Sequence, residues 1–226
     1  MRLTSALTVA TTAALLATAL HAQDADRVVA DGGIAVPGWT GRIDDAAAKK
    51  GLTINSSKFV REGDALHLTI GPAATYWNPA NVAKGNYTVR ASFKEGKTTA
   101  DHPHPAGLFI GGSGLGTDQQ RYMYCVAYGS GEFLIRRFNG STVTTLVRRQ
   151  AHPAVHKTGS DGSVTQEIAW RVRDGRAECL INGQSVAGFD QAEIVGPDRL
   201  ESTDGAYGIR VSHNMDVVVT GLGLTN

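Results

Sequence analysis

The stretch QEIAWRVRDGRAECLINGQ, residues 166–184, decides the fold because it contains two hairpin turns at a short spacing. Asp174-Gly175 and Asn182-Gly183 are each the kind of dipeptide that closes a two-residue β-hairpin. A two-residue turn at the first site fixes which residues of the flanking strands lie opposite one another. The resulting register places apolar pairs on one face: Ile168 with Ile181, Trp170 with Cys179, and Val172 with Ala177.

The chain has two cysteines, Cys125 and Cys179, and both lie in apolar alternating segments. We interpret them as small buried hydrophobes, with a disulfide as the alternative, because geometry rather than count decides whether two cysteines pair. The same burial favours a structural role for Cys179 over a nucleophilic one, since a buried thiol without a neighbouring base stays protonated.

Short alternating segments of the same kind recur along the chain between turns rich in Gly, Asn and Asp. This pattern is typical of an antiparallel sandwich or barrel. Each segment predicts a strand with one face on a core and the other on solvent or a second layer. The predicted strands are residues 65–70, 87–93, 107–111, 122–128, 132–138, 166–173, 176–181, 208–212 and 217–222.

One short helix is predicted at residues 44–50. Asp44 and Asp45 favour its positive amino end, and Lys49 and Lys50 favour its negative carboxyl end. Gly51 follows directly and is suited to close it.

Seven segments succeed one another along the chain: PGW (37–39), VREGDALHLTI (60–70), GNYTVRASF (85–93), GLFIGG (107–112), RYMYCVAYGSGEFLIRRFNG (121–140), EIAWRVRDGRAECLINGQSVAGF (167–189) and DGAYGIRVSHNMDVVVTGLGL (204–224). This succession resembles the concanavalin A-like lectin/glucanase jelly rolls, and within them the laminin-G-like and 3-keto-disaccharide hydrolase-like secreted bacterial domains. The resemblance covers about residues 37–224. It implies an all-β, two-sheet antiparallel jelly-roll sandwich, with a concave face that holds carbohydrate in many relatives.

The chain also departs from the glycan-cleaving members of that superfamily. It has no strand of the form E-x-D-x-x-E, and its QQRYMY segment (119–124) lacks the histidine of a Gln-x-His strand. No catalytic residue is therefore carried over from the resemblance, because function has to be argued from a site rather than from a fold.

The first 22 residues have the layout of a secretory signal peptide, with Arg2 followed by an uncharged run rich in Ala, Leu and Thr. Cleavage fits after Ala22, and Ala17-Thr18-Ala19 offers a second site. We predict a signal peptide at residues 1–22 and a single domain at 23–226, in a secreted or periplasmic protein. Removing Arg2 from the 22 basic groups leaves 21, equal to the 21 acidic groups. That balance excludes the basic surface of a nucleic-acid binder, and no later apolar run is long enough for a membrane span.

A row of three tyrosines shares one face of the predicted strand 122–128. The next strand adds an arginine: a three-residue loop at Gly129-Ser130-Gly131 places Arg136 on this face, and a two-residue turn places Arg137 there instead. Aromatic faces beside fixed polar groups suit a saccharide, although a tyrosine row is also ordinary sheet packing. The predicted ligand-binding residues are Tyr122, Tyr124, Tyr128, Arg136 and Arg137.

Two loops rich in His and Pro carry candidates for catalysis or metal binding. Asp101, His102 and His104 are the candidate acid/base residues. If the loop of His152 and His156 lies beside them, the four imidazoles would suit zinc. Calcium at the rim is the other divalent metal considered, with Asp101, Asp118 or Asp216 as ligands, as the laminin-G-like resemblance suggests. The simpler interpretation is a pair of proline-stiffened rim loops, and no cofactor is predicted.

The sequence favours an exported protein that binds a saccharide on the concave sheet face. One alternative is an enzyme acting on glycosides, for example 3-keto-glycosides, through rim residues such as His104 or through loop acids that converge, among them Asp101, Asp118, Asp204 and Asp216. The strand acids Glu132 and Glu178 are expected at solvated edges. A second alternative is a structural envelope or adhesion module, favoured if a loop fills the concave face.

Overall fold

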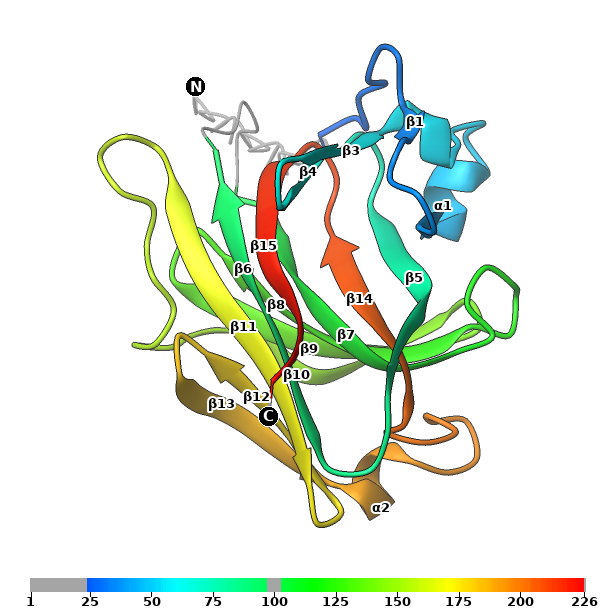
Figure 1. Ribbon diagram of the computed structural model, residues 1–226, viewed down its shortest axis with the longest axis vertical. Helices are drawn as coiled ribbons and strands as arrows, with labels where there is room; N and C mark the ends of the chain where they lie inside the picture. Colours follow the sequence, from blue (N-terminus) through cyan, green and yellow to red (C-terminus); the bar gives the residue numbers. More distant parts are fainter. Residues whose placement is uncertain (1–23, 97–102, 226) are drawn as a thin grey trace, which may run out of the picture.

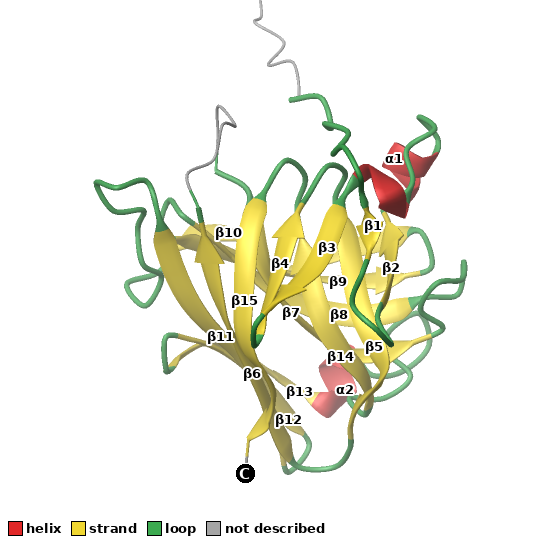
Figure 2. Cartoon of the chain, turned by 45° about the horizontal axis from the view of Figure 1, so that its top comes forward, coloured by secondary structure: helices red, strands yellow, loops and turns green. Residues whose placement is uncertain are grey.

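The computed structural model describes residues 24–96 and 103–225, which form two packed β-sheets (Figures 1 and 2). The eight-stranded sheet has the order β1-β3-β4-β15-β6-β11-β12-β13, and the seven-stranded sheet has the order β10-β9-β8-β7-β14-β5-β2. All pairings between these strands are antiparallel except that of β1 with β3. The fold is therefore the all-β two-sheet jelly-roll sandwich that the sequence predicts.

The strands are β1 (Gly33–Ile34), β2 (Thr40–Ile43), β3 (Lys58–Glu62), β4 (Ala65–Thr69), β5 (Ala74–Ala83), β6 (Tyr87–Glu95), β7 (Pro105–Ser113), β8 (Arg121–Tyr128), β9 (Glu132–Asn139), β10 (Thr142–Ala151), β11 (Val164–Arg173), β12 (Arg176–Ile181), β13 (Gln184–Asp190), β14 (Gly205–Val211) and β15 (Asp216–Thr225). Two short helices, α1 (Asp45–Ala48) and α2 (Gln191–Ile194), and the 3-10 turn η1 (Ile54–Ser56) complete the described elements. Neither helix is long and apolar enough to cross a membrane.

The hairpins of residues 166–184 have the predicted register. Trp170 pairs with Cys179 and Val172 with Ala177 across β11 and β12. Asp174 and Asn182 have φ of 50° and 49°, and the glycine after each has φ of 77° or 80°. Positive φ at both central residues is what a type I′ turn requires, so both turns match the twist of their strands.

The core lies between the two sheets and is crossed by a disulfide between Cys125 of β8 and Cys179 of β12. Our interpretation of these residues as free thiols was wrong, although their burial is confirmed, since both are fully buried. Beside them Trp170 is also fully buried, and its indole Nε1 donates to the carbonyl oxygen of Leu108 on the opposite sheet at 3.2 Å. The sheets are therefore joined by a covalent bond and by a hydrogen bond as well as by apolar packing.

All nine predicted strands are present, with bounds that differ by a few residues at most. The helix predicted at residues 44–50 is shorter in the structure, where α1 ends at Ala48. Gly51 has a φ of 84°, the positive value expected of a residue that closes a helix. Six further strands and α2 were not predicted. The predicted signal peptide at residues 1–22 lies outside the described residues.

Residues 24–27 run against the turn between β14 and β15 and belong to the packed domain. The backbone N–H of Arg27 donates to Oδ1 of Asn214 at 2.8 Å, and its guanidinium donates to the carbonyl oxygens of Ile70 and Met215. Nδ2 of Asn214 in turn donates to Oδ2 of Asp24 at 2.9 Å. This segment is held at the edge of the sandwich, where it forms one wall of the cavity described below.

Candidate functional site

The outer face of the seven-stranded sheet, which points away from the eight-stranded sheet, has its own apolar cluster. The loop of residues 114–120 covers one part of this face, with Leu115 packed on the cluster and Asp118 in an ion pair of 3.0 Å with Arg42 of β2. The members of the cluster are Trp77, Phe109, Tyr122, Tyr124, Val126, Tyr128, Leu134 and Phe138. A loop therefore fills only part of the face on which the sequence places a ligand.

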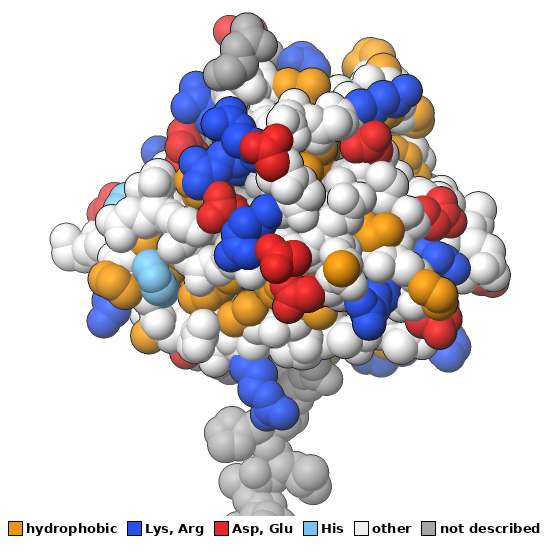
Figure 3. Space-filling model, turned by 90° about the horizontal axis from the view of Figure 1, so that it is seen from below, with side chains coloured by type: hydrophobic (Ala, Val, Ile, Leu, Met, Phe, Trp, Pro, Cys, Tyr) orange, Lys and Arg blue, Asp and Glu red, His pale blue; other side chains and the backbone are white. Residues whose placement is uncertain are grey.

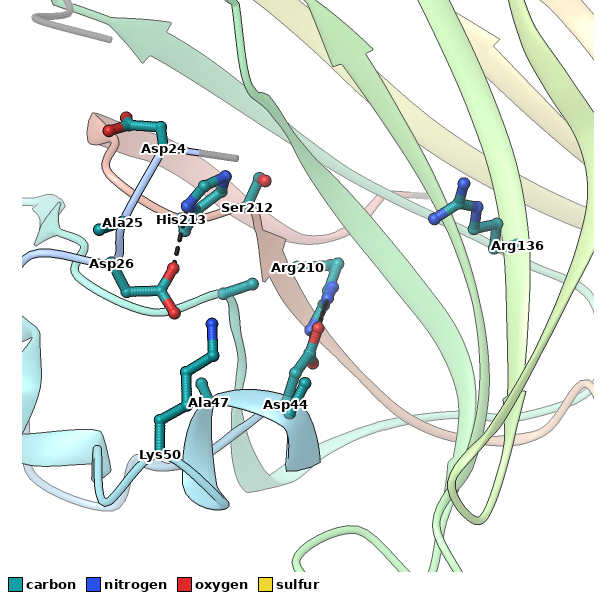
Figure 4. A pocket seen from close by; sticks show the side chains of 12 residues that line it. Asp24, Ala25, Asp26, Asp44, Ala47, Lys50, Arg136, Arg210, Ser212 and His213 are labelled. Carbon is teal, nitrogen blue, oxygen red and sulfur yellow. Dashed lines mark hydrogen bonds and ion pairs between the residues drawn. The ribbon is translucent and has the colours of Figure 1, made fainter. Parts of the chain in front are cut away.

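The uncovered part of this face contains two adjoining cavities that share Arg136, Arg210 and Ser212, and we call them together the groove. The larger, of about 400 Å³, is the acidic end; it lies between the sheet, α1 and residues 24–26 (Figure 4). The smaller, of about 100 Å³, is the tyrosine end and is lined by Tyr124 and Tyr128. Carboxylates, guanidinium groups and hydroxyls thus converge in one concave place, as in small-molecule sites.

An ion pair between the buried Arg210 and the half-buried Asp44 lines the groove. Both terminal nitrogens of Arg210 donate to the two carboxylate oxygens of Asp44 at 2.6 Å, and one also donates to Oγ1 of Thr75 at 3.3 Å. The hydroxyl of Thr75 lies 2.8 Å from that of Tyr122, so the network continues beneath the sheet surface. The charge of Asp44 helps to raise the pKa of Arg210 above its ordinary value despite burial, which opposes the shift.

The acidic end also contains His213, which follows β14. Its Nδ1 lies 2.9 Å from Oδ1 of Asp26, and Figure 4 shows both side chains at the groove wall. The ring of His104 packs edge-on against that of His213, with the centroids 4.1 Å apart. A carboxylate and an imidazole side by side form an arrangement that suits hydrogen bonding to a ligand or proton transfer.

The structure brings three of the five predicted ligand-binding residues into the groove: Tyr124, Tyr128 and Arg136. The chain pairs Tyr124 with Arg136 across β8 and β9, as the three-residue loop requires. Arg137 lies on the opposite face beside Met123, so of the two registers considered the structure has the one that places Arg136 on the tyrosine face. Tyr122 is 1% exposed, beneath Phe138 at a ring distance of 4.8 Å, and does not line the groove.

The remaining tyrosine rings offer little open aromatic surface, in contrast to the flat platform that the sequence predicts. Tyr124 and Tyr128 are 5% and 8% exposed. The guanidinium of Arg149 lies over the ring of Tyr128, 4.1 Å from its centroid. Burial raises the pKa of Tyr128, an effect that the charges of Arg149 and Arg136 oppose only in part. Its hydroxyl thus stays protonated at neutral pH and can donate a hydrogen bond.

The described histidines of the two His-Pro loops have separate contacts. His104 packs on His213, whereas the ring of His152 lies against Phe133, and Nδ1 of His156 lies 3.0 Å from the carbonyl oxygen of Thr165. Within residues 24–96 and 103–225 no group of three or more His, Cys, Asp or Glu side chains is arranged to hold a metal ion. Asp101 and His102 lie outside the described residues.

The loop acids proposed for catalysis or calcium do not converge among the described residues. Asp118 binds Arg42, Asp204 accepts from the backbone of Gly85, and Asp216 contacts His67. The strand acids are not at solvated edges, because β9 and β12 each lie one strand in from the edge of their sheets. Both are half-buried in ion pairs, Glu132 with Arg149 and Glu178 with Arg171. The acids of the groove, Asp24, Asp26 and Asp44, were not predicted as site residues.

Because Glu95, at the end of β6, is half-buried, we expect the free energy of unfolding to depend on pH. It lines a small cavity with His104, Met215 and Asp216, and burial raises its pKa from the ordinary 4.5 to about 8. The folded chain therefore holds a proton that the unfolded chain loses, so stability falls as pH rises from about 4.5 to about 8. Glu95→Gln should match the wild type at pH 5 and exceed it by about 2 kcal/mol at pH 9, after allowance for solvent screening of the half-buried carboxyl.

Urea unfolding at pH 5, 7 and 9 measures this difference. Glu201→Gln removes the same charge from an exposed position and serves as the control, with the same small effect at every pH. A Glu95→Gln effect that does not change between pH 5 and pH 9 would contradict the prediction.

The chain matches no known family model and no curated protein sequence. Solved structures with a similar fold include a carbohydrate binding module, CBM66 from Bacillus subtilis, with a TM-score of 0.57 at 8% identity, covering 86% of this chain and 99% of that one. A Bacillus subtilis protein of unknown function with a galectin-like fold has a TM-score of 0.57 at 15% identity, covering 82% and 88%. An endo-β-1,3-glucanase from Pyrococcus furiosus has a TM-score of 0.52 at 10% identity, covering 83% of this chain and 87% of that one. These likenesses confirm the concanavalin A-like jelly-roll fold.

Proposed function

We propose that the groove binds a saccharide. The observation that carries the proposal is the convergence of Asp26, Arg136, Arg210, Ser212 and His213 at one concave place on a jelly-roll sheet face. Saccharides present many hydroxyls that both donate and accept hydrogen bonds, and rigid carboxylates and guanidinium groups match them. Two of the similar folds support the same class of ligand, since one is a carbohydrate binding module and one a glucanase.

The same proposal includes export. The signal-peptide pattern of residues 1–22 and the Cys125–Cys179 disulfide both favour an oxidising compartment outside the cytoplasm. A saccharide of an envelope or an extracellular matrix would be accessible to the groove there.

A blocking substitution on α1 tests the proposal. Ala46 is exposed and lines the acidic end, whereas Ala48 on the same helix is exposed and does not. We expect Ala46→Trp to fill the cavity and weaken glycan binding at least about 10-fold, because the bulky ring would clash with any ligand there. Isothermal titration against glycans first selected on a broad array measures the affinity.

Ala48→Trp is the matched control and should leave the affinity within about 2-fold, since it adds the same ring outside the groove. Equal losses in both variants, or no glycan binding by the wild type across the array, would overturn the proposal. The second result would favour the structural envelope or adhesion module.

Glycoside cleavage is a second candidate, favoured by one observation: the carboxylate of Asp26 lies 2.9 Å from the imidazole of His213 at the groove wall. Asp44 is a poor candidate for proton transfer because Arg210 holds both of its oxygens. Incubation with the bound glycan and with 3-keto-disaccharides, followed by product analysis, separates the two functions. Turnover that Asp26→Asn abolishes would assign catalysis, and an intact ligand would leave binding alone.

A further inference from the structure

The two ends of the groove differ in charge. The acidic end contains all three carboxylates of the groove, those of Asp24, Asp26 and Asp44, together with one lysine, Lys50, that the tyrosine end lacks. No acidic residue lines the tyrosine end, which is surrounded by two arginines, two tyrosines and Ser212. Every polar side chain there can donate a hydrogen bond, whereas the only side-chain acceptors are hydroxyls. The tyrosine end therefore favours the negatively charged part of a ligand.

Arg136 is the cation that remains available at this end. Arg210 already donates to both oxygens of Asp44, and Arg149 above Tyr128 is paired with Glu132. Arg136 is exposed, and no carboxylate of the described residues lies within ion-pair distance of it. Figure 4 shows its side chain extending from β9 toward the groove. It lines both cavities, so a ligand that spans them passes its guanidinium.

The neighbours of Arg136 strengthen this preference. The hydroxyl of Tyr128 is protonated at neutral pH, as that of any tyrosine is, and burial raises its pKa further, so it is a donor beside the guanidinium. Ser212 supplies another hydroxyl, and Arg210 adds positive charge although its hydrogen bonds are used. A planar guanidinium binds a carboxylate or a sulfate through two parallel hydrogen bonds, which a neutral hydroxyl cannot accept in that way.

We propose that the saccharide of the groove is anionic, with its carboxylate or sulfate ester in the tyrosine end against Arg136 and its neutral hydroxyls in the acidic end. This inference rests on the proposed function and names the class of its ligand. The acids of the far end contribute specificity against a second anionic group only where that group approaches Asp24 and Asp26 rather than Lys50.

Titration with matched pairs of oligosaccharides tests the inference. The first pairs are oligouronides and their carboxyl-reduced forms, which keep the ring and linkage and replace the carboxylate by a hydroxymethyl group. The second pairs are sulfated galactan oligosaccharides and their desulfated forms. We expect the wild type to bind the charged member of one pair at least about 10-fold more tightly, with affinity that falls as salt rises from 50 to 500 mM. The pair that shows the preference identifies carboxylate or sulfate as the source of the charge.

Arg136→Gln should weaken binding of the charged member about 10- to 100-fold and change binding of the neutral member less than about 3-fold. Arg148→Gln removes the same charge from an exposed position outside the groove and should change neither. Arg136→Lys should recover part of the loss, because it restores the charge without the planar fork.

Three results would be decisive against the inference. The first is equal affinity for the charged and neutral members of every pair, and the second is an equal effect of Arg136→Gln and Arg148→Gln on binding. Either result would show that the ligand is not selected for its negative charge, and would leave the proposal of saccharide binding intact. Absence of binding to every member of every pair and to the array would refute the proposed function itself.

Discussion

Replacing Cys125 and Cys179 together by alanine should lower the free energy of unfolding by about 4 kcal/mol. The disulfide joins positions separated by 54 residues, and a cross-link of that span removes much of the conformational entropy of the unfolded chain. It also joins β8 of one sheet to β12 of the other, at the centre of the core. Loss of the bond therefore affects the contact between the two layers, with a smaller packing loss from the shortened side chains.

Urea unfolding measures this effect in three samples: the oxidised wild type, the reduced wild type and the double alanine variant. Comparing them separates the loss of the cross-link from the loss of side-chain packing. Reduction requires denaturant, since both cysteines are fully buried in the folded chain. The reduced wild type should lose most of the 4 kcal/mol, because it lacks the cross-link and keeps both side chains. A reductant should not affect the alanine variant. Equal stability of the oxidised and reduced wild type, within about 1 kcal/mol, would contradict the prediction.

The register of residues 166–184 could be predicted because its determinants are local. Asp174-Gly175 and Asn182-Gly183 specify two-residue turns, and such turns fix the pairing of the strands on both sides. Sheet order and the contact between sheets depend on residues far apart in the sequence. The pairing of Cys125 with Cys179 is an example, because their distance follows from how β8 and β12 stack across the core.

The strands that sequence reasoning missed lack regular alternation. β10 is an edge strand with most of its residues exposed, so neither face carries an apolar pattern. β5 contains Pro79 and changes from buried to exposed residues along its length. Whether these two segments form strands depends on their positions in the sheet rather than on intrinsic β-propensity. A short stretch of sequence does not show where in a sheet it will lie.

The candidate site was predicted in part for the same reason. Tyr124, Tyr128 and Arg136 share a face through strand periodicity and one hairpin, which are local features. Loop 114–120 packs Leu115 on the apolar cluster that contains Tyr122, and strand periodicity does not show where a loop folds. Asp44 was interpreted as a favourable charge at a helix end, whereas it binds Arg210, 166 residues away. The available signal was Arg210 itself, a lone charge within the apolar strand segment GAYGIRV.

Asp44→Ala should destabilise the protein by about 3 to 5 kcal/mol, and more than Arg210→Met does. The Arg210 side chain is 8% exposed, whereas that of Asp44 is 33% exposed. Removing Asp44 leaves a guanidinium in a buried position without its counter-charge, and that desolvation is not offset. Removing Arg210 instead leaves a carboxylate that water can reach, and methionine fills much of the vacated volume.

The double variant Asp44→Ala/Arg210→Met separates the cost of an unpaired charge from the value of the pair. It should be more stable than Asp44→Ala alone, because the second substitution removes the stranded guanidinium. Asp45→Ala is the local control: its ion pair with Arg42 is more exposed, so it should cost less than about 1 kcal/mol. Urea unfolding of the four variants at pH 7 gives the comparison. If Arg210→Met proves more damaging than Asp44→Ala, the guanidinium stabilises the fold mainly through its contacts with Thr75, Tyr124 and Phe138 rather than through its charge balance with Asp44.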